Sequence, residues 1–226
     1  DIYVGAEDIW AFDGFTKKNW WNKINCMIWT TLDSQPILPS AIDAAPKIKN
    51  YFIWSSFGQK DLNKLGFDHV KTLHGSLQCD SFFRLPDQDR LNLRAIQGIP
   101  QDAFIVGFVF RNQLRKSVPN LLEGYKEFCS QNPSAKAYLL LHTHWKEGWD
   151  IPRLIKEKDI DGSKILTTYF CQKCRRYEIK PYSGEGLDCR FCGTQKSQQT
   201  VNIRAGVSER QLNEVYNLMD VYCHPF

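Results

Sequence analysis

The feature that most constrains the fold is a regular alternation of short apolar runs with segments of helical periodicity. In the first half of the chain, KNYFIWSS (49–56) precedes the helical pattern FGQKDLNKLGF (57–67). In the second half, AFIVGFVF (103–110) precedes SVPNLLEGYKEFCSQNP (117–133), and the apolar run AKAYLLLHT (135–143) follows. Continuous apolar strands are typical of parallel sheets that helices cover on both faces. The pattern therefore predicts an α/β fold with doubly wound parallel sheets.

The alternation occurs in two series, which the polar segment RLPDQDRLNLRAIQGIPQDA (84–103) separates. We interpret this segment as a linker, because it is polar and contains two prolines. The sequence thus predicts two Rossmann-like domains, over residues 1–98 and 99–226. The chain starts with Asp1 rather than Met and ends on a strand-like run, so we expect an internal fragment in which both domains are incomplete.

Composition narrows the class of protein without identifying a ligand. The 226 residues carry a formal net charge of +4, which is compatible with phosphate-bearing ligands but too weak to indicate nucleic-acid binding. No apolar run approaches the roughly 18 residues of a spanning helix, and the start DIYVGAED lacks the features of a secretory signal. Four of the eight cysteines are isolated, as is typical of a reducing compartment. We expect a cytoplasmic protein.

The other four cysteines form two CxxC pairs, Cys171 with Cys174 and Cys189 with Cys192, with 14 residues between the pairs. Two such pairs can direct four thiolates onto one cation, and tetrahedral sulfur ligation favours Zn²⁺. We predict a zinc ribbon over residues 171–196, inserted in the second domain. Four thiolates close the coordination sphere, so this Zn²⁺ would be structural. Disulfides or unliganded thiols are the alternatives.

The predicted ribbon also contains six cations, with aromatic residues among them. Its Lys and Arg residues outnumber its three acidic ones; they are Lys173, Arg175, Arg176, Lys180, Arg190 and Lys196. Such a mixture can contact a nucleic acid or another anionic partner. The solvated face of a small metal-bound loop has the same composition, so both interpretations stay open.

A second candidate site is the segment RNQLRKS (111–117), which directly follows the apolar run 103–110. In open parallel sheets, ligands bind outside the carboxyl ends of the strands, and a helix N-terminus favours phosphate. Arg111, Arg115 and Lys116 add positive charge there, and Ser117 is predicted to cap the following helix. The segment therefore indicates a phosphate site, although exposed basic loops are common in proteins of many functions.

Two stretches of the second half, GIPQDAFIVGFVFRNQLRKSVPNLLEGYKEFCSQNPSAKAYLLLH (98–142) and GVSERQLNEVYNLMDVYCHPF (206–226), resemble the C-terminal half of GT-B glycosyltransferases, specifically the large retaining family 4. The shared pattern is a strand, an Arg, four residues, a Lys and a helix. The stretch YFIWSSFGQKDLNKLGFDHVKTLHGSLQCDSFF (51–83) resembles the acceptor-side domain of the same family. The resemblance does not include the cysteine-rich insertion.

This resemblance implies a GT-B fold and the transfer of a sugar from a nucleotide-sugar donor to an acceptor, with retention of configuration. Arg111 and Lys116 fall on the family's Arg and Lys, which hold the donor diphosphate, and Arg115 joins them by proximity. Because these cations would neutralise the leaving group, no catalytic metal is expected. The family's glycine-rich loop and Glu-x7-Glu segment would lie before Asp1 and after Phe226.

Four further side chains are candidates for the acceptor side or for the border of the pocket. Asp33, in TTLDSQP, is a candidate catalytic carboxylate that could orient an acceptor hydroxyl, although turns commonly use Asp in this way. His74 stands where the family has Asn in an Asn-Gly-Val-Asp turn. His142 and His144 follow an apolar strand and could border the donor pocket or be structural.

Two functional interpretations of different classes are therefore open. In the first, the chain belongs to a glycosyltransferase whose acceptor is a saccharide, a protein or a nucleic acid, and the ribbon could present that acceptor. In the second, it is a non-enzymatic module that binds a nucleic acid or a protein through the basic ribbon. The sequence does not identify the donor base, the sugar, the acceptor or the oligomeric state.

Overall fold

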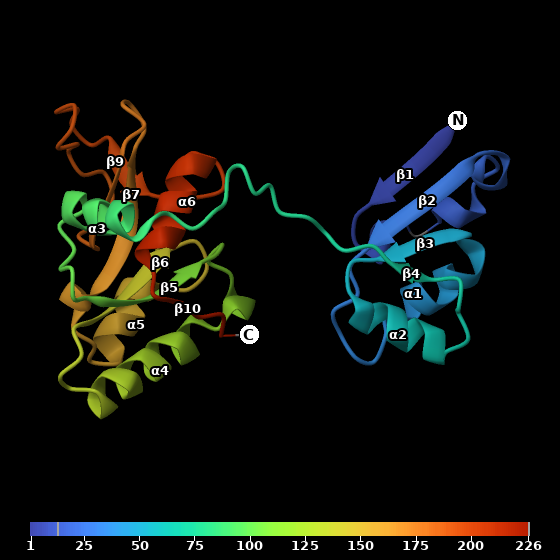
Figure 1. The fold of residues 1–226 in the computed structure, drawn as a ribbon, viewed down its shortest axis with the longest axis horizontal. Coiled ribbons are helices and arrows are strands. Elements are labelled where there is room, and N and C mark those ends of the chain that lie inside the picture. Colours follow the sequence, from blue (N-terminus) through green and yellow to red (C-terminus); the bar gives the residue numbers. More distant parts are fainter. Residues whose placement is uncertain (13, 226) are drawn as a thin grey trace. The chain divides into compact units, whose positions relative to one another are not determined.

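The computed structural model describes residues 1–12 and 14–225 and divides the chain into two compact units, Asp1–Leu77 and Gln78–Phe226 (Figure 1). Each unit is built on a mostly parallel sheet, which confirms the predicted α/β class. The division at Leu77 lies earlier in the chain than the boundary predicted at residue 98.

The first unit contains a four-stranded parallel sheet in the order β1-β2-β3-β4. The strands are β1 (Ile2–Ala6), β2 (Asn25–Thr30), β3 (Asn50–Ile53) and β4 (Lys71–Thr72). The α-helices are α1 (Pro39–Ala44) and α2 (Ser56–Lys64), and the 3-10 helices are η1 (Ile9–Phe12), η2 (Phe15–Lys17), η3 (Trp21–Lys23) and η4 (Ala45–Lys47).

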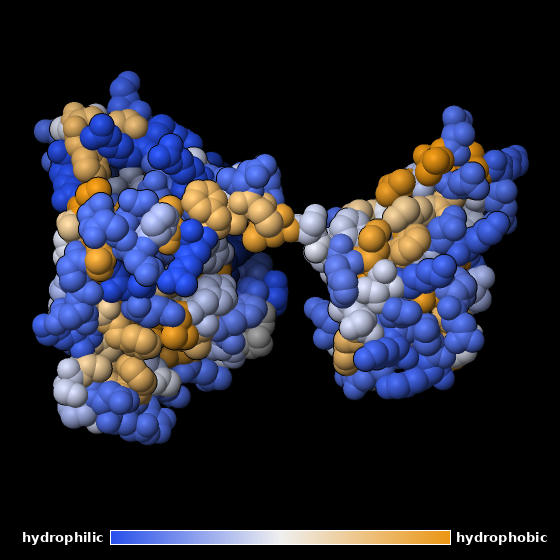
Figure 2. Space-filling model, viewed as in Figure 1, coloured by the Kyte–Doolittle hydropathy of each residue, from blue (hydrophilic) through white to orange (hydrophobic). Residues whose placement is uncertain are grey.

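One face of this first sheet holds the core of the unit. Ile28, Tyr51 and Ile53 are buried there against α1 and α2. On the opposite face, Ile2 and Val4 of β1 are 74% and 58% exposed, and Figure 2 shows hydrophobic surface over β1. Within the described part of this unit, the helices thus cover one face of the sheet. The apolar strands of the sequence, in contrast, predict helices on both faces.

The second unit contains a six-stranded sheet in the order β10-β5-β6-β7-β8, with β9 also paired to β7. The strands are β5 (Phe104–Val109), β6 (Ala137–His142), β7 (Ile165–Cys171), β8 (Tyr177–Pro181), β9 (Gln198–Thr200) and β10 (Val221–Tyr222). The helices are α3 (Asp87–Ile96), α4 (Val118–Gln131), α5 (Ile151–Glu157) and α6 (Glu209–Leu218), with 3-10 helices η5 (Leu114–Lys116) and η6 (Gly162–Lys164).

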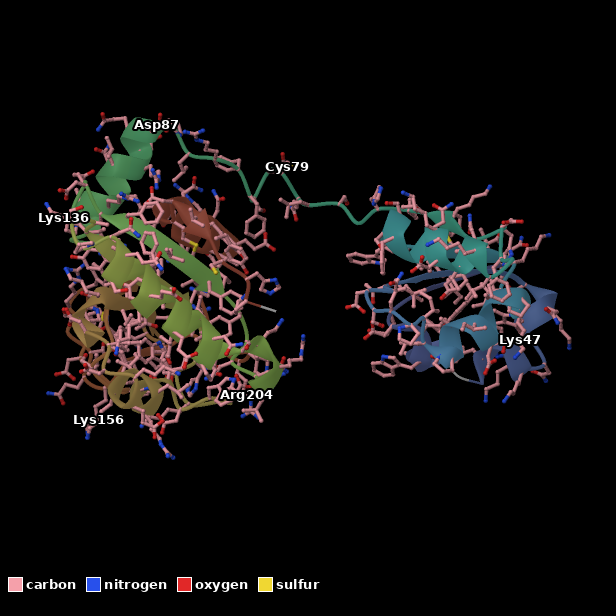
Figure 3. All side chains as sticks on the ribbon, turned by 90° about the horizontal axis from the view of Figure 1, so that it is seen from below. Lys47, Cys79, Asp87, Lys136, Lys156 and Arg204 are labelled. Carbon is pink, nitrogen blue, oxygen red and sulfur yellow. The ribbon has the colours of Figure 1, made fainter. Side chains whose placement is uncertain are left out.

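Helices cover both faces of the second sheet. Leu139 and Leu141 pack in one core with residues of α4 and α5, and Leu140 packs in another with residues of α3 and α6. In Figure 3, Asp87 of α3 and Lys156 of α5 lie on opposite sides of this unit. Strands β5, β6 and β7 follow one another across the sheet, and β10 pairs with the other side of β5. The order therefore reverses at β5, as it does at the switch point of a doubly wound sheet.

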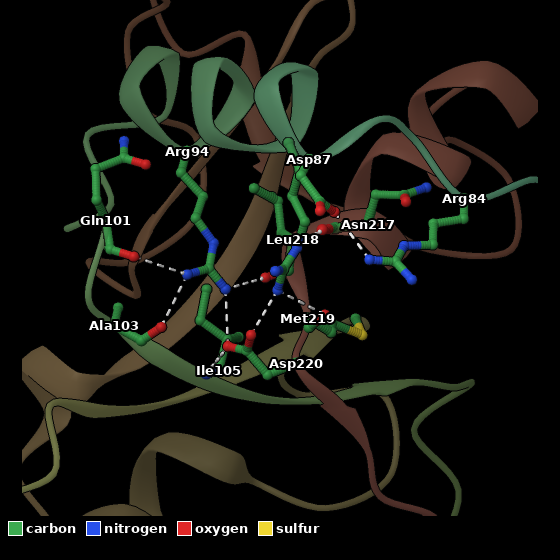
Figure 4. Close-up of polar contacts among 11 residues, drawn as sticks. Arg84, Asp87, Arg94, Gln101, Ala103, Ile105, Asn217, Leu218, Met219 and Asp220 are labelled. Carbon is green, nitrogen blue, oxygen red and sulfur yellow. Dashed lines mark hydrogen bonds and ion pairs between the residues drawn. The ribbon is translucent and has the colours of Figure 1, made fainter.

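Residues 87–96 are a helix, α3, rather than part of the predicted linker 84–103. The reason is a set of contacts with distant parts of the chain, drawn in Figure 4. Arg94 of α3 is almost fully buried and donates hydrogen bonds to the carbonyls of Ala103 and Leu218 and to the carboxylate of Asp220. These bonds fix α3 to the second sheet, so the segment belongs to the second unit.

The start of α4 also differs from expectation. Ser117 lies in the left-handed region, with φ of 49°, and its side chain does not cap the helix. The 3-10 turn η5 precedes it and ends at Lys116. At α6, by contrast, Ser208 and Gln211 form a reciprocal capping box.

Among the described residues, no helix has the length and apolar character needed to cross a membrane.

Candidate functional site

The four paired cysteines converge on one point in the second unit. Cys171 is the last residue of β7 and Cys174 follows in the adjoining turn, while Cys189 and Cys192 come from the loop between β8 and β9. The Sγ atoms of Cys171 and Cys192 are 3.8 Å apart, those of Cys174 and Cys189 are 3.7 Å apart, and all four lie within 4.8 Å of one another. The predicted clustering is confirmed.

These distances fit a metal site and not a disulfide. A disulfide joins sulfurs about 2.05 Å apart. Sulfurs about 2.3 Å from a tetrahedral Zn²⁺ lie about 3.8 Å from one another, which is the separation seen in both pairs. Burial raises the pKa of the Cys171 thiol, but hydrogen bonds from Ser197 and from backbone amides outweigh it and bring the pKa to about 6. The pKa of Cys174 is instead raised to about 11, so Cys171 and Cys174 do not ionise alike.

The cysteine module, residues 171–200, is continuous with the domain sheet, whereas the sequence indicated an excursion from it over residues 171–196. Strand β8 pairs antiparallel with β7 from Leu166 to Phe170, and β9 pairs antiparallel with the end of β7. Strand β8 therefore covers an edge of β7 that would otherwise be open. The first of the four cysteines, Cys171, is itself a sheet residue with no exposed surface.

Four of the six cations predicted in the ribbon contact other residues of the second unit. Arg175 stacks on Phe170 at 4.5 Å, and both Arg176 and Arg190 lie over Phe191. Lys180 and Arg190 also form ion pairs with the buried carboxylate of Glu178, at 2.9 and 3.0 Å. These contacts fit the structural interpretation of the ribbon, while Arg175, Arg176 and Arg190 stay exposed to solvent.

A second feature is a cavity of about 220 Å³ at the carboxyl ends of β5 and β6, which we call the carboxyl-edge cavity. Three predicted site residues, Arg111, His142 and His144, line it together. The opposite wall is apolar and comes from the segment 201–207, directly after β9, and from Leu212 of α6. The cavity lies at the sheet edge where parallel α/β folds bind ligands.

Sequence reasoning missed the partners that hold the polar wall of this cavity. Arg111 donates two hydrogen bonds to Oε1 of Glu147, at 3.0 and 2.7 Å. The buried side chain of Asn112 donates to the carbonyls of His144 and Trp149 and accepts from the Trp149 amide. Asn112 thus fastens the loop after β5 to the loop after β6. The sequence around Asn112 does not predict these contacts, because the two loops are distant in sequence.

Two buried polar groups face the cavity. His142 is 9% exposed, and its Nδ1 lies 2.9 Å from Oγ1 of Thr168. Thr143 is 2% exposed, and its Oγ1 has no hydrogen-bond partner among the residues described in the structure. A buried hydroxyl without a partner is costly in an apolar surrounding, which indicates a place for a bound water or ligand atom.

His142 predicts a pH dependence of stability. Burial lowers its pKa from 6.5 to about 4. Between these values the unfolded chain binds a proton that the folded chain does not, so the free energy of unfolding should fall by up to about 1.4 kcal/mol per unit as pH drops through this window. Urea unfolding at several pH values measures it, and His142→Asn should flatten the slope. An unchanged slope in that variant would assign the effect to other groups.

The other predicted diphosphate residues do not line the cavity. Arg115 and Lys116 are in the 3-10 turn η5, one residue before Ser117 at the start of α4. Burial, followed by the nearby charge of Arg115, lowers the pKa of Lys116. The structure therefore brings Arg111 together with the two histidines at the cavity and places Lys116 later in the loop after β5, directly before α4.

Asp33 and His74 belong to the first unit. Asp33 is exposed in the segment after β2. His74 follows β4, and its Nδ1 lies 2.9 Å from the carbonyl oxygen of Trp54. Trp54 stacks on Trp29, with ring centroids 4.7 Å apart. Both candidates are thus near the carboxyl ends of parallel strands of their own sheet.

Comparison with known proteins adds no assignment, because no family model matches the chain and no curated protein matches it.

Proposed function

We propose that the chain forms the nucleotide-binding part of a glycosyltransferase that uses a nucleotide-sugar donor and retains the configuration of the sugar. The observation that carries this proposal is the carboxyl-edge cavity, in which Arg111, His142 and His144 meet at the end of a doubly wound sheet. The reversed strand order at β5 favours a nucleotide ligand at this edge. The sequence resemblance to retaining GT-B enzymes supplies the class of reaction.

In this proposal, the second unit stabilises the departing diphosphate. Negative charge grows on the diphosphate as the glycosidic bond breaks, and fixed cations aimed at that charge lower the barrier. Arg111 borders the cavity, and Lys116 stands at the start of α4, whose N-terminal amides add partial positive charge. His142, neutral at physiological pH because burial lowers its pKa to about 4, would donate or accept a hydrogen bond.

We further propose that the four cysteines hold a structural Zn²⁺. The sulfur spacing fits tetrahedral ligation, and four protein ligands leave no position for water or substrate. The metal would stabilise the cysteine module and take no part in glycosyl transfer. A binding module built on the basic ribbon is less well supported, because Arg175, Arg176, Lys180 and Arg190 all contact other side chains of the second unit.

The proposal is tested by a thermal-shift panel with UDP, GDP and ADP. We expect one of them to raise the melting temperature of the second unit, since a ligand that binds only the folded state stabilises it. Lys116→Ala and Arg111→Ala should each weaken that binding, and Lys173→Ala, an exposed cation of the ribbon, is the matched control. Absence of any shift with all three nucleotides would remove the support for a nucleotide-sugar enzyme.

Glu147 provides a separate prediction about the same cavity. Its carboxylate occupies Arg111 and would repel a diphosphate beside it. Glu147→Gln keeps the size of the side chain and removes the charge, so the affinity for the stabilising nucleoside diphosphate should rise about five- to tenfold, as charge-assisted bonds of 1–3 kcal/mol allow. Isothermal titration calorimetry measures this. A weaker affinity would mean that Glu147 positions Arg111 for the ligand.

A further inference from the structure

The apolar wall of the carboxyl-edge cavity begins where the cysteine module ends. Val201, Asn202 and Ile203 line the cavity and directly follow β9, the last strand of the module. The wall continues to Gly206 and Val207, in a segment without α-helix or β-strand, and it includes Leu212 of α6. One end of the segment 201–207 is therefore fixed by β9 and the other by α6.

On one side, β9 is held by the strand that carries the first cysteine. Cys171 is paired with Gln198 in the antiparallel register, and the amide of Gln172 donates to the carbonyl of Ser197 at 3.0 Å. The Cys171 Sγ itself lies 3.3 Å from Oγ of Ser197. The metal ligand thus contacts the residue immediately before β9.

On the other side, β9 is held by the loop between the two CxxC pairs. The carboxylate of Glu185 accepts hydrogen bonds from the amide and the hydroxyl of Thr200, at 2.7 and 2.6 Å. Leu187 and Gln198 exchange two backbone hydrogen bonds, at 3.0 and 2.9 Å. Gln198 and Thr200 have no exposed surface. Both of these segments end at the four thiols, and the side chain of Gln198 also bonds to Glu178 and Lys180 of β8.

We infer that the metal centre positions the apolar wall of the cavity, so that metal binding at the cysteines and ligand binding in the cavity strengthen each other. Without the cation, the thiols no longer close the loop that carries Glu185, and the support that this loop gives to β9 is weakened. The wall from Val201 to Val207 then samples more conformations, and a ligand must order it on binding, which lowers affinity. The effect of the metal on ligand affinity rests on the proposed function, whereas the effect of the metal on the order of the wall is independent of it.

The effect of the metal on the order of the wall is tested by amide hydrogen exchange on the zinc-loaded and the chelator-treated protein. We expect the amides of 198–203 to exchange at least about tenfold faster after metal removal, as local opening becomes easier. The amides of β5 and β6 are the internal control and should keep their protection, which shows that the unit remains folded. Equal protection of 198–203 in both states would overturn the inference.

A variant with all four ligands intact separates the wall from the metal. Glu185→Gln should retain zinc but weaken the support of Thr200, with faster exchange at 198–203 and nucleoside diphosphate affinity reduced about fivefold. Lys173→Ala replaces an exposed side chain of the same module and is the matched control. Retained protection and unchanged affinity in Glu185→Gln would contradict the positioning role.

Reciprocity gives the decisive readout, because coupled sites change each other's affinity by the same factor. The dissociation constant for zinc, measured at equilibrium by competition with a coloured chelator, should fall by the same factor when UDP, GDP or ADP is bound. If the zinc-loaded protein binds none of them, the proposed function fails while the exchange result stands by itself. If a nucleotide binds equally with and without zinc, the proposed function survives and the coupling is refuted.

Discussion

Cys171→Ser is expected to abolish metal binding and to lower the melting temperature of the second unit by about 10 °C or more. The side chain has no exposed surface, and it ends the strand on which β8 and β9 are assembled. Serine replaces a thiolate ligand by a hydroxyl that does not ionise near neutral pH, so the remaining three ligands no longer complete a tetrahedral site.

The size of this effect follows from the linkage between metal binding and folding. The unfolded chain has no preformed site, so the free energy of metal binding adds to the free energy of folding. Differential scanning calorimetry measures the melting temperature, and elemental analysis measures the metal, with one Zn²⁺ per chain expected in the unsubstituted protein and none in the variant. Cys192→Ser should also lose the metal, but with a smaller drop in melting temperature because Cys192 is exposed.

Cys79→Ser is the matched control, because it makes the same replacement of cysteine by serine outside the four-cysteine cluster. Cys79 is an exposed thiol outside the cluster, so its replacement should leave both the metal content and the melting temperature nearly unchanged. If Cys171→Ser retained a full equivalent of metal, the four-cysteine site would be refuted. Retained stability after the loss of metal would show that β7, β8 and β9 form a sheet without the cation.

The parts of the molecule that sequence predicts well are those with local determinants. The strands at 104–109 and 137–142 are continuous apolar runs, and the two CxxC pairs carry their spacing in the chain itself. A sulfur cluster needs only short turns at each pair, so its existence follows from a few neighbouring residues. The α/β class and the cysteine cluster could therefore be derived without coordinates.

The parts that sequence does not predict depend on residues far apart in the chain. Helix α3 lies between two prolines in a polar segment, and what holds it is the burial of Arg94 against residues 103 and 218–220. Likewise, the carboxyl-edge cavity combines the ends of β5 and β6 with a wall from 201–207. Neither assembly has a signature within a single window of sequence, because the contacts that define it are tertiary.

Asp220→Ala is expected to lower the free energy of unfolding of the second unit by about 3–5 kcal/mol, since it removes the counterion of the buried Arg94, although the Asp220 side chain itself is 23% exposed. Oδ2 of Asp220 accepts hydrogen bonds from Arg94 at 2.7 Å and from the Ile105 amide at 2.8 Å, and Oδ1 accepts one from Arg90 at 2.6 Å. The Arg94 side chain is only 4% exposed, so its charge would remain in a nearly dry site without a counterion (Figure 4).

The pH dependence of this network has a defined sign. Burial opposes ionisation of Asp220, but the bonds from Arg90, the Ile105 amide and Arg94 outweigh it and lower its pKa. A carboxyl group whose pKa is lower in the folded state stabilises the protein above its unfolded pKa of about 3.9, and the stabilisation is lost as pH falls through the folded pKa. Asp220→Asn should therefore remove part of the acid sensitivity that unfolding experiments detect below about pH 4.

The exposed pair of Arg84 and Asp87, also in Figure 4, is the control. It separates the effect of burying a charged partner from the effect of losing an ion pair. Its atoms are 2.8 Å apart, as close as those of the buried network, but its side chains are 82% and 78% exposed. Exposed pairs contribute about 0–1 kcal/mol, so Asp87→Ala should change urea unfolding far less than Asp220→Ala. Equal losses from the two variants would show that the contact with β5 and β10, and thus the attachment of α3, does not depend on the buried Arg94.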